Sequence, residues 1–272
     1  MGAGIAHALL LAGSSVQLVE RDSDAAQAAL ARVRRAVDAS VARGLIEFAD
    51  KAMTRLDVAT SFADLGTVGL VVEAIPEDLD LKMTTLRAVE DMLSADAVIA
   101  SNTSSISLAT LGNSLAHPER LLGLHFFNPV PASKLVEIVI ADRTTPQLRD
   151  VAVSWVKQLG KTPVVVRDTP GFASSRLGVL LGLEAIRMVE QGVASAEDID
   201  AAMTLGYGHP VGPLRLTDLV GLDVRLGIAR YLEQELGPQF RPPDLLVELV
   251  ERGDLGQKTG RGFYEWDEEG QR

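Results

Sequence analysis

The sequence predicts a doubly wound α/β domain over residues 1–168, followed by an all-helical domain over residues 169–272. Up to about Leu159, short runs rich in Val, Ile and Leu alternate with helical stretches. Apolar strands separated by helices are typical of a parallel sheet that is covered on both faces. Pro170 and Gly171 interrupt this pattern, and only helical periodicity follows them. We therefore expect a domain boundary near Asp168.

The individual elements follow from the same periodicity. The apolar runs predicted as strands are Ser15–Glu20, Val68–Ile75, Ala97–Thr103, Arg120–Pro129, Lys134–Ile140 and Thr162–Val166. The predicted helices are Gly2–Ala12, Asp24–Gly44, Leu79–Ser94, Ser107–Gly112, Thr145–Leu159, Leu177–Gln191, Ser195–Leu205 and Leu222–Leu236. The alternation of strand and helix ends where the second domain begins.

Composition excludes several classes of function. The net charge of −11 argues against a nucleic-acid partner or an anionic membrane surface. The chain has no cysteine, which excludes disulfides, thiol catalysis and zinc–thiolate sites. No apolar run approaches the roughly 18 residues that a membrane span needs, and no basic stretch precedes the N-terminal apolar helix. We expect a cytoplasmic protein.

The opening "MGAGIAHALLLAGSSVQLVERD" resembles the second half of a dinucleotide-binding fingerprint. Gly2 fits its third glycine, where a helix N-terminus holds a pyrophosphate. Glu20, after the next strand, fits the acid that binds a ribose and favours NAD over NADP, although Arg21 weakens this preference. The alternative is a glycine-rich helix start without a ligand.

Polar residues follow the predicted strand at Ala97–Thr103, in the run "SNTSSIS". The carboxyl ends of parallel strands are where α/β folds place ligands. Ser104 is the strongest ligand candidate in this run. Ser105 and Ser107 have a simpler interpretation, because a serine before a short helix caps it.

His125 ends an apolar strand, and Glu137 lies in the next one. A histidine held by a carboxylate is a common general base, since the acid fixes the tautomer and stabilises the imidazolium. The alternative is a buried ion pair without a catalytic role. The residues alone leave both interpretations open.

An ordered set of motifs then narrows the choice. "SNTSS", "GLHFFNPVP", "KLVEIV", "DTPGF..SR", "HPVGPL" and "KTGRGFYEW" occur in sequence. Together they resemble the L-3-hydroxyacyl-CoA dehydrogenases, especially the short-chain bacterial 3-hydroxybutyryl-CoA type, over essentially the whole chain. The resemblance implies a Rossmann-type domain, NAD, no metal, a CoA thioester substrate, a role in fatty acid metabolism and a homodimer formed through the helical domain.

The resemblance also implies roles for matching residues. His125 is the base for the substrate 3-hydroxyl, and Glu137 orients it. Ser104 bonds the reacting oxygen and borders the cofactor, Asn128 lies near the nicotinamide, and Glu20 binds the adenosine ribose.

Glu77 and Lys82 belong to a stretch that lines the cofactor in the resembled family. For Glu77 a simpler explanation exists, because acids that open a helix favour its N-terminal dipole.

Two departures from the family pattern stand out. Ser175 occupies the place of an asparagine whose amide helps to hold the substrate carbonyl, so Ser174 or Ser175 substitutes, or the substrate is positioned differently. The first fingerprint strand and the first two glycines would lie before Met1. We expect an N-terminally truncated Rossmann-type domain that binds NAD weakly or not at all.

Two other functions stay open at this point. One is a dehydrogenase of a free hydroxy or sugar acid, as in the lambda-crystallin-like relatives. The other is a catalytically silent oligomeric paralogue, which the serine at 175 and the incomplete fingerprint motivate.

Overall fold

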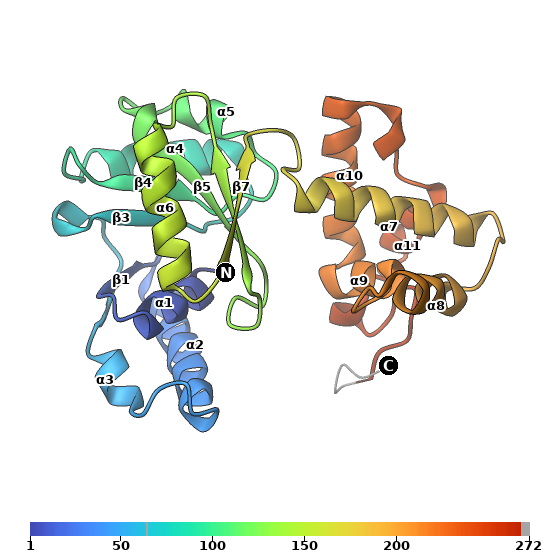
Figure 1. The fold of residues 1–272 in the computed structure, drawn as a ribbon, viewed down its shortest axis with the longest axis horizontal. Coiled ribbons are helices and arrows are strands. Elements are labelled where there is room, and N and C mark those ends of the chain that lie inside the picture. Colours follow the sequence, from blue (N-terminus) through green and yellow to red (C-terminus); the bar gives the residue numbers. More distant parts are fainter. Residues whose placement is uncertain (64, 268–272) are drawn as a thin grey trace. The chain divides into compact units, whose positions relative to one another are not determined.

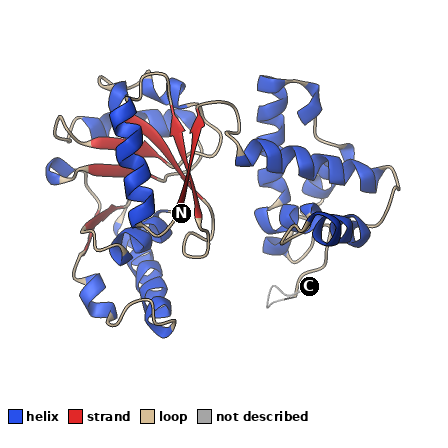
Figure 2. Cartoon of the chain, in the orientation of Figure 1, coloured by secondary structure: helices blue, strands red, loops and turns tan. Residues whose placement is uncertain are grey.

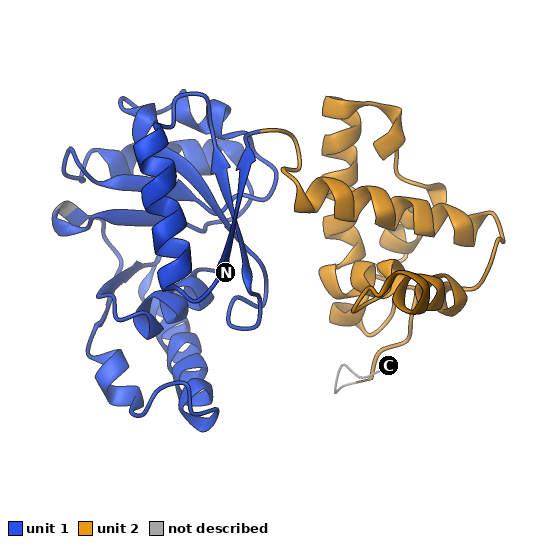
Figure 3. Ribbon diagram, viewed as in Figure 1, with its two compact units in different colours: residues 1–168 blue, residues 169–272 orange. Residues whose placement is uncertain are grey.

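The computed structural model describes residues 1–63 and 65–267, which divide into two compact units. Unit 1 is Met1–Asp168 and unit 2 is Thr169–Arg272 (Figure 3). Each unit has its own hydrophobic core. The units are therefore described separately.

Unit 1 alternates strands and helices (Figure 1; Figure 2). Its strands are β1 (Val16–Val19), β2 (Leu56–Ala59), β3 (Leu70–Glu73), β4 (Val98–Ser101), β5 (Leu121–Phe126), β6 (Leu135–Ile140) and β7 (Thr162–Arg167). Its α-helices are α1 (Gly2–Leu11), α2 (Ser23–Ala42), α3 (Ala49–Met53), α4 (Leu79–Glu90), α5 (Leu108–Gly112) and α6 (Pro146–Gln158).

The main sheet has five strands in the order β3-β4-β5-β6-β7. All neighbours are parallel except β5 and β6, which pair antiparallel. The predicted parallel sheet is interrupted at this pair. The link between these strands covers only residues 127–134, whereas a parallel crossover needs a dozen residues or more. A short link therefore forces the chain to turn back.

The strand β2, which the sequence patterns did not predict, pairs with β1 in a separate two-stranded parallel sheet. It has four residues, and the exposed Asp57 interrupts its apolar run. Among the described residues, β1 and β3 each keep one edge without a neighbouring strand. β1 therefore belongs to the small sheet, and β3 is an edge strand of the main sheet.

The helix α1 contributes to the packing of both sheets. Ile5 and Ala8 join the apolar cluster of the main sheet, together with α6, whereas Ala6 and Leu10 pack with α2 and β1. α6 crosses one face of the main sheet, and α4 and α5 lie behind it (Figure 1). Both faces of the sheet are therefore covered, as the apolar strands require.

Unit 2 is helical, with α7 (Ser174–Glu190), α8 (Ala196–Tyr207), α9 (Pro213–Val220), α10 (Leu222–Leu236) and α11 (Asp244–Glu251). α8 illustrates how the sequence sets the ends of a helix. The Ser195 hydroxyl accepts the Asp198 amide at its start, and Gly208 closes it with a φ of 73°. Such a left-handed φ carries no steric cost for glycine.

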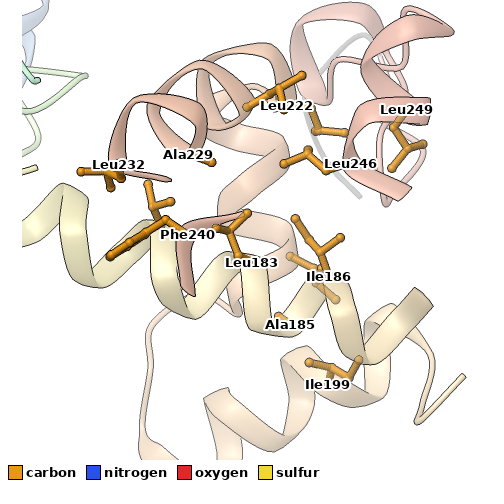
Figure 4. Packing of buried hydrophobic residues seen from close by; sticks show 13 residues of the cluster. Leu183, Ala185, Ile186, Ile199, Leu222, Ala229, Leu232, Phe240, Leu246 and Leu249 are labelled. Carbon is orange, nitrogen blue, oxygen red and sulfur yellow. The ribbon is translucent and has the colours of Figure 1, made fainter. Parts of the chain in front are cut away.

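The core of unit 2 lies where α7, α10 and α11 meet. Leu183, Leu222 and Leu246 are 0% exposed and pack together with Phe240 (Figure 4). Truncating such a leucine to alanine costs about 2–5 kcal/mol. This core therefore holds the helices in place.

The segment after α11 docks against α9 through a buried carboxylate. Asp218 accepts hydrogen bonds from the Phe263 and Tyr264 amides and from the Trp266 indole. Burial raises the pKa of Asp218, although these three bonds oppose the rise. Trp266 is buried, whereas Phe263 and Tyr264 are half-buried.

Candidate active site

His125 and Glu137 face each other across the antiparallel pair β5–β6. His125 Nδ1 donates a hydrogen bond to Glu137 Oε2 at 2.9 Å. The two residues are 4% and 1% exposed, so water competes little for this bond. Register is the local reason for the contact, because directly opposed residues on one face of an antiparallel pair lie side by side.

This geometry defines the chemistry available to the imidazole. Nδ1 carries the proton of its hydrogen bond to the Glu137 carboxylate, which leaves Nε2 as the basic nitrogen of the neutral ring. The ring of Phe127 packs against the imidazole, with centroids 4.6 Å apart. The imidazole is therefore fixed in tautomer and orientation, as a general base requires.

The loop that carries Ser104 is fastened to Glu77. Glu77 Oε1 accepts hydrogen bonds from the Thr103 hydroxyl at 2.6 Å, from the Ser104 amide at 2.9 Å, and from the amide and hydroxyl of Ser105. Burial raises the pKa of Glu77, but the Thr103 bond, the Lys82 ammonium and the loop bonds outweigh it, so the net pKa is lowered. Glu77 thus fixes the backbone at Ser104.

Lys82, expected to line the cofactor, lies inside a buried charge network. Its ammonium is 2.7 Å from Glu73 Oε1 and 3.3 Å from Glu77 Oε2, and its side chain is 1% exposed. The other Glu73 oxygen accepts the Ser101 hydroxyl at 2.6 Å. This network ties the ends of β3 and β4 to α4.

Asn102 is a positioning residue that the sequence reasoning did not single out. Its side-chain oxygen accepts the Phe126 amide at 2.8 Å, and the residue is 8% exposed. The bond links the end of β4 to the end of β5, next to His125. The only sequence signal was its place in the polar run after a buried strand.

The remaining serines of that run have separate roles. Ser107 is the N-cap of α5 and accepts the Thr110 amide at 3.4 Å. Ser105 is bound to Glu77 and does not cap this helix. The capping interpretation therefore holds for Ser107 and is wrong for Ser105.

The residues at the start of α1 suit a dinucleotide. No side chain caps this helix and its first turn has no acid, so its N-terminal amides are suited to a phosphate. Glu20 directly follows β1, with its side chain 32% exposed and Arg32 at 4.0 Å. Gly4 is the tightly packed glycine, because a Cβ there would lie 3.0 Å from Val130, whereas Gly2 has only an ordinary contact.

Asn128 and Ser175 are the remaining predicted site residues. Asn128 is exposed, directly after β5, and forms a cis peptide bond with Pro129. Ser175 is half-buried in the first turn of α7, in unit 2. The structure thus brings together His125 with Glu137 and Ser104 with Glu77 and Lys82.

Comparison with known proteins decides the family. The model of the 3-hydroxyacyl-CoA dehydrogenase NAD binding domain matches residues 1–169, and that of the 3-hydroxyacyl-CoA dehydrogenase C-terminal domain matches residues 171–266. The chain belongs to the 3-hydroxyacyl-CoA dehydrogenase family. It is an NAD-dependent oxidoreductase with a Rossmann-like domain followed by a helical domain.

Individual relatives agree with this assignment over nearly the full length of the dehydrogenase. A 3-hydroxybutyryl-CoA dehydrogenase of Mycobacterium tuberculosis is 41% identical over 271 residues, which cover 97% of this chain and 94% of that protein. The structure of FadB2 from M. tuberculosis matches with a TM-score of 0.94 at 40% identity, covering 98% and 95% of the two chains. The (S)-3-hydroxybutyryl-CoA dehydrogenase PaaH1 from Ralstonia eutropha matches with a TM-score of 0.94 at 37% identity, covering 98% and 96%.

Proposed function

We propose that this dehydrogenase interconverts (S)-3-hydroxyacyl-CoA and 3-oxoacyl-CoA thioesters of short acyl length, with His125 as the general base. The observation that carries the proposal is the buried 2.9 Å hydrogen bond between His125 and Glu137. The names of the relatives, which are 3-hydroxybutyryl-CoA dehydrogenases, support the short acyl chain.

In this mechanism, His125 Nε2 takes the proton of the 3-hydroxyl as the hydrogen on C3 leaves. A bound NAD would supply the acceptor for that hydrogen, which leaves C3 as a hydride. Glu137 stabilises the imidazolium that forms, because its negatively charged carboxylate accepts the hydrogen bond from Nδ1–H. In the reverse direction the same imidazolium returns the proton to the 3-oxo oxygen.

Further residues bind and orient the reactants. Ser104 bonds the reacting oxygen from a loop that Glu77 holds still. Ser175 contacts the thioester carbonyl in place of an asparagine. Gly2 and Glu20 contact the pyrophosphate and the adenosine ribose, and Asn128 borders the nicotinamide. Glu77 and Lys82 support the cofactor side of the loop through the charge network.

A homodimer formed through the helical domain is part of the proposal. Large apolar side chains are exposed on unit 2, among them Leu177 at 67%, Leu205 at 86% and Tyr207 at 79%. Exposed apolar side chains that gather in one patch mark association surfaces, so these residues support the proposal. We also place the enzyme in the cytoplasm and assign it a role in fatty acid metabolism. None of the helices in residues 1–63 and 65–267 is long and apolar enough to cross a bilayer.

The test follows NADH loss spectrophotometrically with acetoacetyl-CoA as substrate. His125→Gln is expected to lower kcat by about 100- to 10,000-fold, the usual contribution of a general base. His117→Gln is the matched control, because His117 is exposed and pairs with the exposed Glu119. Unchanged turnover in His125→Gln would overturn the proposal, and activity on a free sugar acid instead of the thioester would favour the alternative function.

A further inference from the structure

The link between β5 and β6, residues 127–134, is folded into a compact turn. The Pro129 carbonyl accepts hydrogen bonds from the Ala132 and Ser133 amides, both at 3.0 Å. Pro129 is exposed, whereas Val130 is only 2% exposed. One side of the link therefore faces solvent, and the other side is packed into unit 1.

Lys161, the residue before β7, holds this link in place. Its ammonium donates hydrogen bonds to the Val130 carbonyl at 2.7 Å and to the Ser133 carbonyl at 2.5 Å. Hydrogen bonds from a charged donor are stronger than those from a neutral one. Burial lowers the pKa of Lys161, because the ammonium has lost part of its water. A residue about thirty positions away in the chain thus fastens the link.

The link in turn packs against the first turn of α1. A Cβ at Gly4 would lie 3.0 Å from the Val130 Cβ, which is closer than ordinary van der Waals contact. His7, one turn further along α1, is also near the lysine. Burial lowers the pKa of His7, and the Lys161 charge lowers it further. Lys161 therefore acts on the start of α1 through Val130.

The other end of the link begins beside the general base. The Phe127 ring packs against the imidazole of His125, and Asn128 is the next residue along the chain. The imidazole has its own 2.9 Å hydrogen bond to Glu137, which does not involve the link. A displaced link would therefore disturb Asn128 and the start of α1 more than it would disturb the base.

We propose that Lys161 is a positioning residue for the cofactor, because it holds the link and the start of α1 in the arrangement that binds NAD. The inference rests on the proposed function, in which Asn128 borders the nicotinamide and the start of α1 contacts the pyrophosphate. Lys161 acts through the link and is not itself a catalytic residue. A displacement of about 1 Å by a residue far from the reaction can cost about 100-fold in rate.

The test replaces the ammonium and measures cofactor binding and turnover separately. Lys161→Met keeps the apolar stem of the side chain and removes its donors. We expect the Kd for NADH, measured by fluorescence titration, and the KM for NADH to rise by about 10-fold, the scale of losing one charged hydrogen bond. The kcat with acetoacetyl-CoA should stay within about 3-fold of wild type, because His125 keeps its bond to Glu137.

Three further variants separate positioning from a general loss of folding, which urea denaturation measures for each. Lys161→Arg keeps the charge and the donors and is expected to recover most of the NADH affinity. Lys157→Met removes an exposed ammonium from α6 and should behave as wild type. Where Lys161→Met folds poorly, Lys161→Gln takes its place, because it keeps a neutral donor, and the same direction of change is expected.

A double variant tests the route through Val130. In Gly4→Ala the added Cβ presses on Val130, so NADH affinity should fall while Lys161 holds the link in place. In Gly4→Ala with Lys161→Met the link can yield, and the combined loss should be smaller than the product of the two single losses. Losses that multiply would show that Lys161 does not act through Val130, and would overturn the inference.

The remaining outcomes distinguish this inference from the proposed function. Wild-type NADH affinity in folded Lys161→Met would overturn the inference and leave the proposed function intact. A fall in kcat with Kd and KM unchanged would also overturn it, because the link would then act on the base. Wild-type enzyme that binds no NADH would overturn it as well. If the wild-type enzyme binds NADH but does not reduce acetoacetyl-CoA, the proposed function itself fails.

Discussion

His125 and Glu137 are bonded at 2.9 Å in the interior of the dehydrogenase, and each comes from a different strand of one antiparallel pair. The register His125↔Glu137 sets this contact, so neither side chain needs a flexible loop to reach the other. β5 and β6 are the antiparallel pair in the otherwise parallel main sheet. Their antiparallel register places His125 opposite Glu137.

Replacing the carboxylate tests its part in catalysis. In Glu137→Gln the side-chain shape is kept but the charge that stabilises the imidazolium is lost. We expect kcat to fall by about 100- to 10,000-fold with KM little changed, measured by NADH loss with acetoacetyl-CoA. Glu119→Gln, in the exposed His117–Glu119 pair, is the control. Equal activity of Glu137→Gln and wild type would rule out this role.

Lys82 is predicted to be essential for stability. Lys82→Met leaves the buried Glu73 carboxylate with the Ser101 hydroxyl but without its ammonium partner. We expect the free energy of unfolding to fall by about 3–5 kcal/mol, measured by urea denaturation. The double variant Glu73→Gln with Lys82→Met is expected to recover part of the loss. A single variant as stable as wild type would contradict the network.

The Glu77 interactions predict a pH dependence. The pKa of Glu77 is lowered in the folded state, so its contribution is present above the usual value of 4.5 and is lost as pH falls below it. Between about pH 7 and about pH 3.5, wild type should lose more unfolding free energy than Glu77→Gln. The exposed Glu47→Gln should follow wild type. Parallel curves for all three proteins would show that Glu77 makes no such contribution.

The docked C-terminal segment depends on one acceptor. Asp218 Oδ2 accepts the Tyr264 amide and the Trp266 indole, and Oδ1 accepts the Phe263 amide. In Asp218→Asn, an NH2 group that cannot accept these bonds replaces one of the two oxygens. We expect a loss of about 3 kcal/mol in unfolding free energy and faster proteolysis of residues 256–267. Glu235→Gln, exposed on α10, is the control. Wild-type resistance to proteolysis in Asp218→Asn would refute this account.

The positions of most helices and strands could be predicted from the sequence, because their periodicity and caps are local. The four-residue strand β2 could not be predicted, since its pairing with β1 comes from forty residues away in the chain rather than from its own pattern. Ser105 and Ser107 show the same limit. The sequence allows either serine to cap the helix. In the structure the Ser105 hydroxyl bonds Glu77, and Ser107 is the residue that caps α5.

The sequence by itself determined the family, the cofactor and the residue types of the site, because these are carried by ordered motifs and by local alternation of strand and helix. Only the tertiary structure decided that the sheet turns antiparallel at β5–β6 and that Lys82 is enclosed by two carboxylates. The physical reason is that burial and charge pairing depend on which distant segments meet, and no local pattern encodes that meeting.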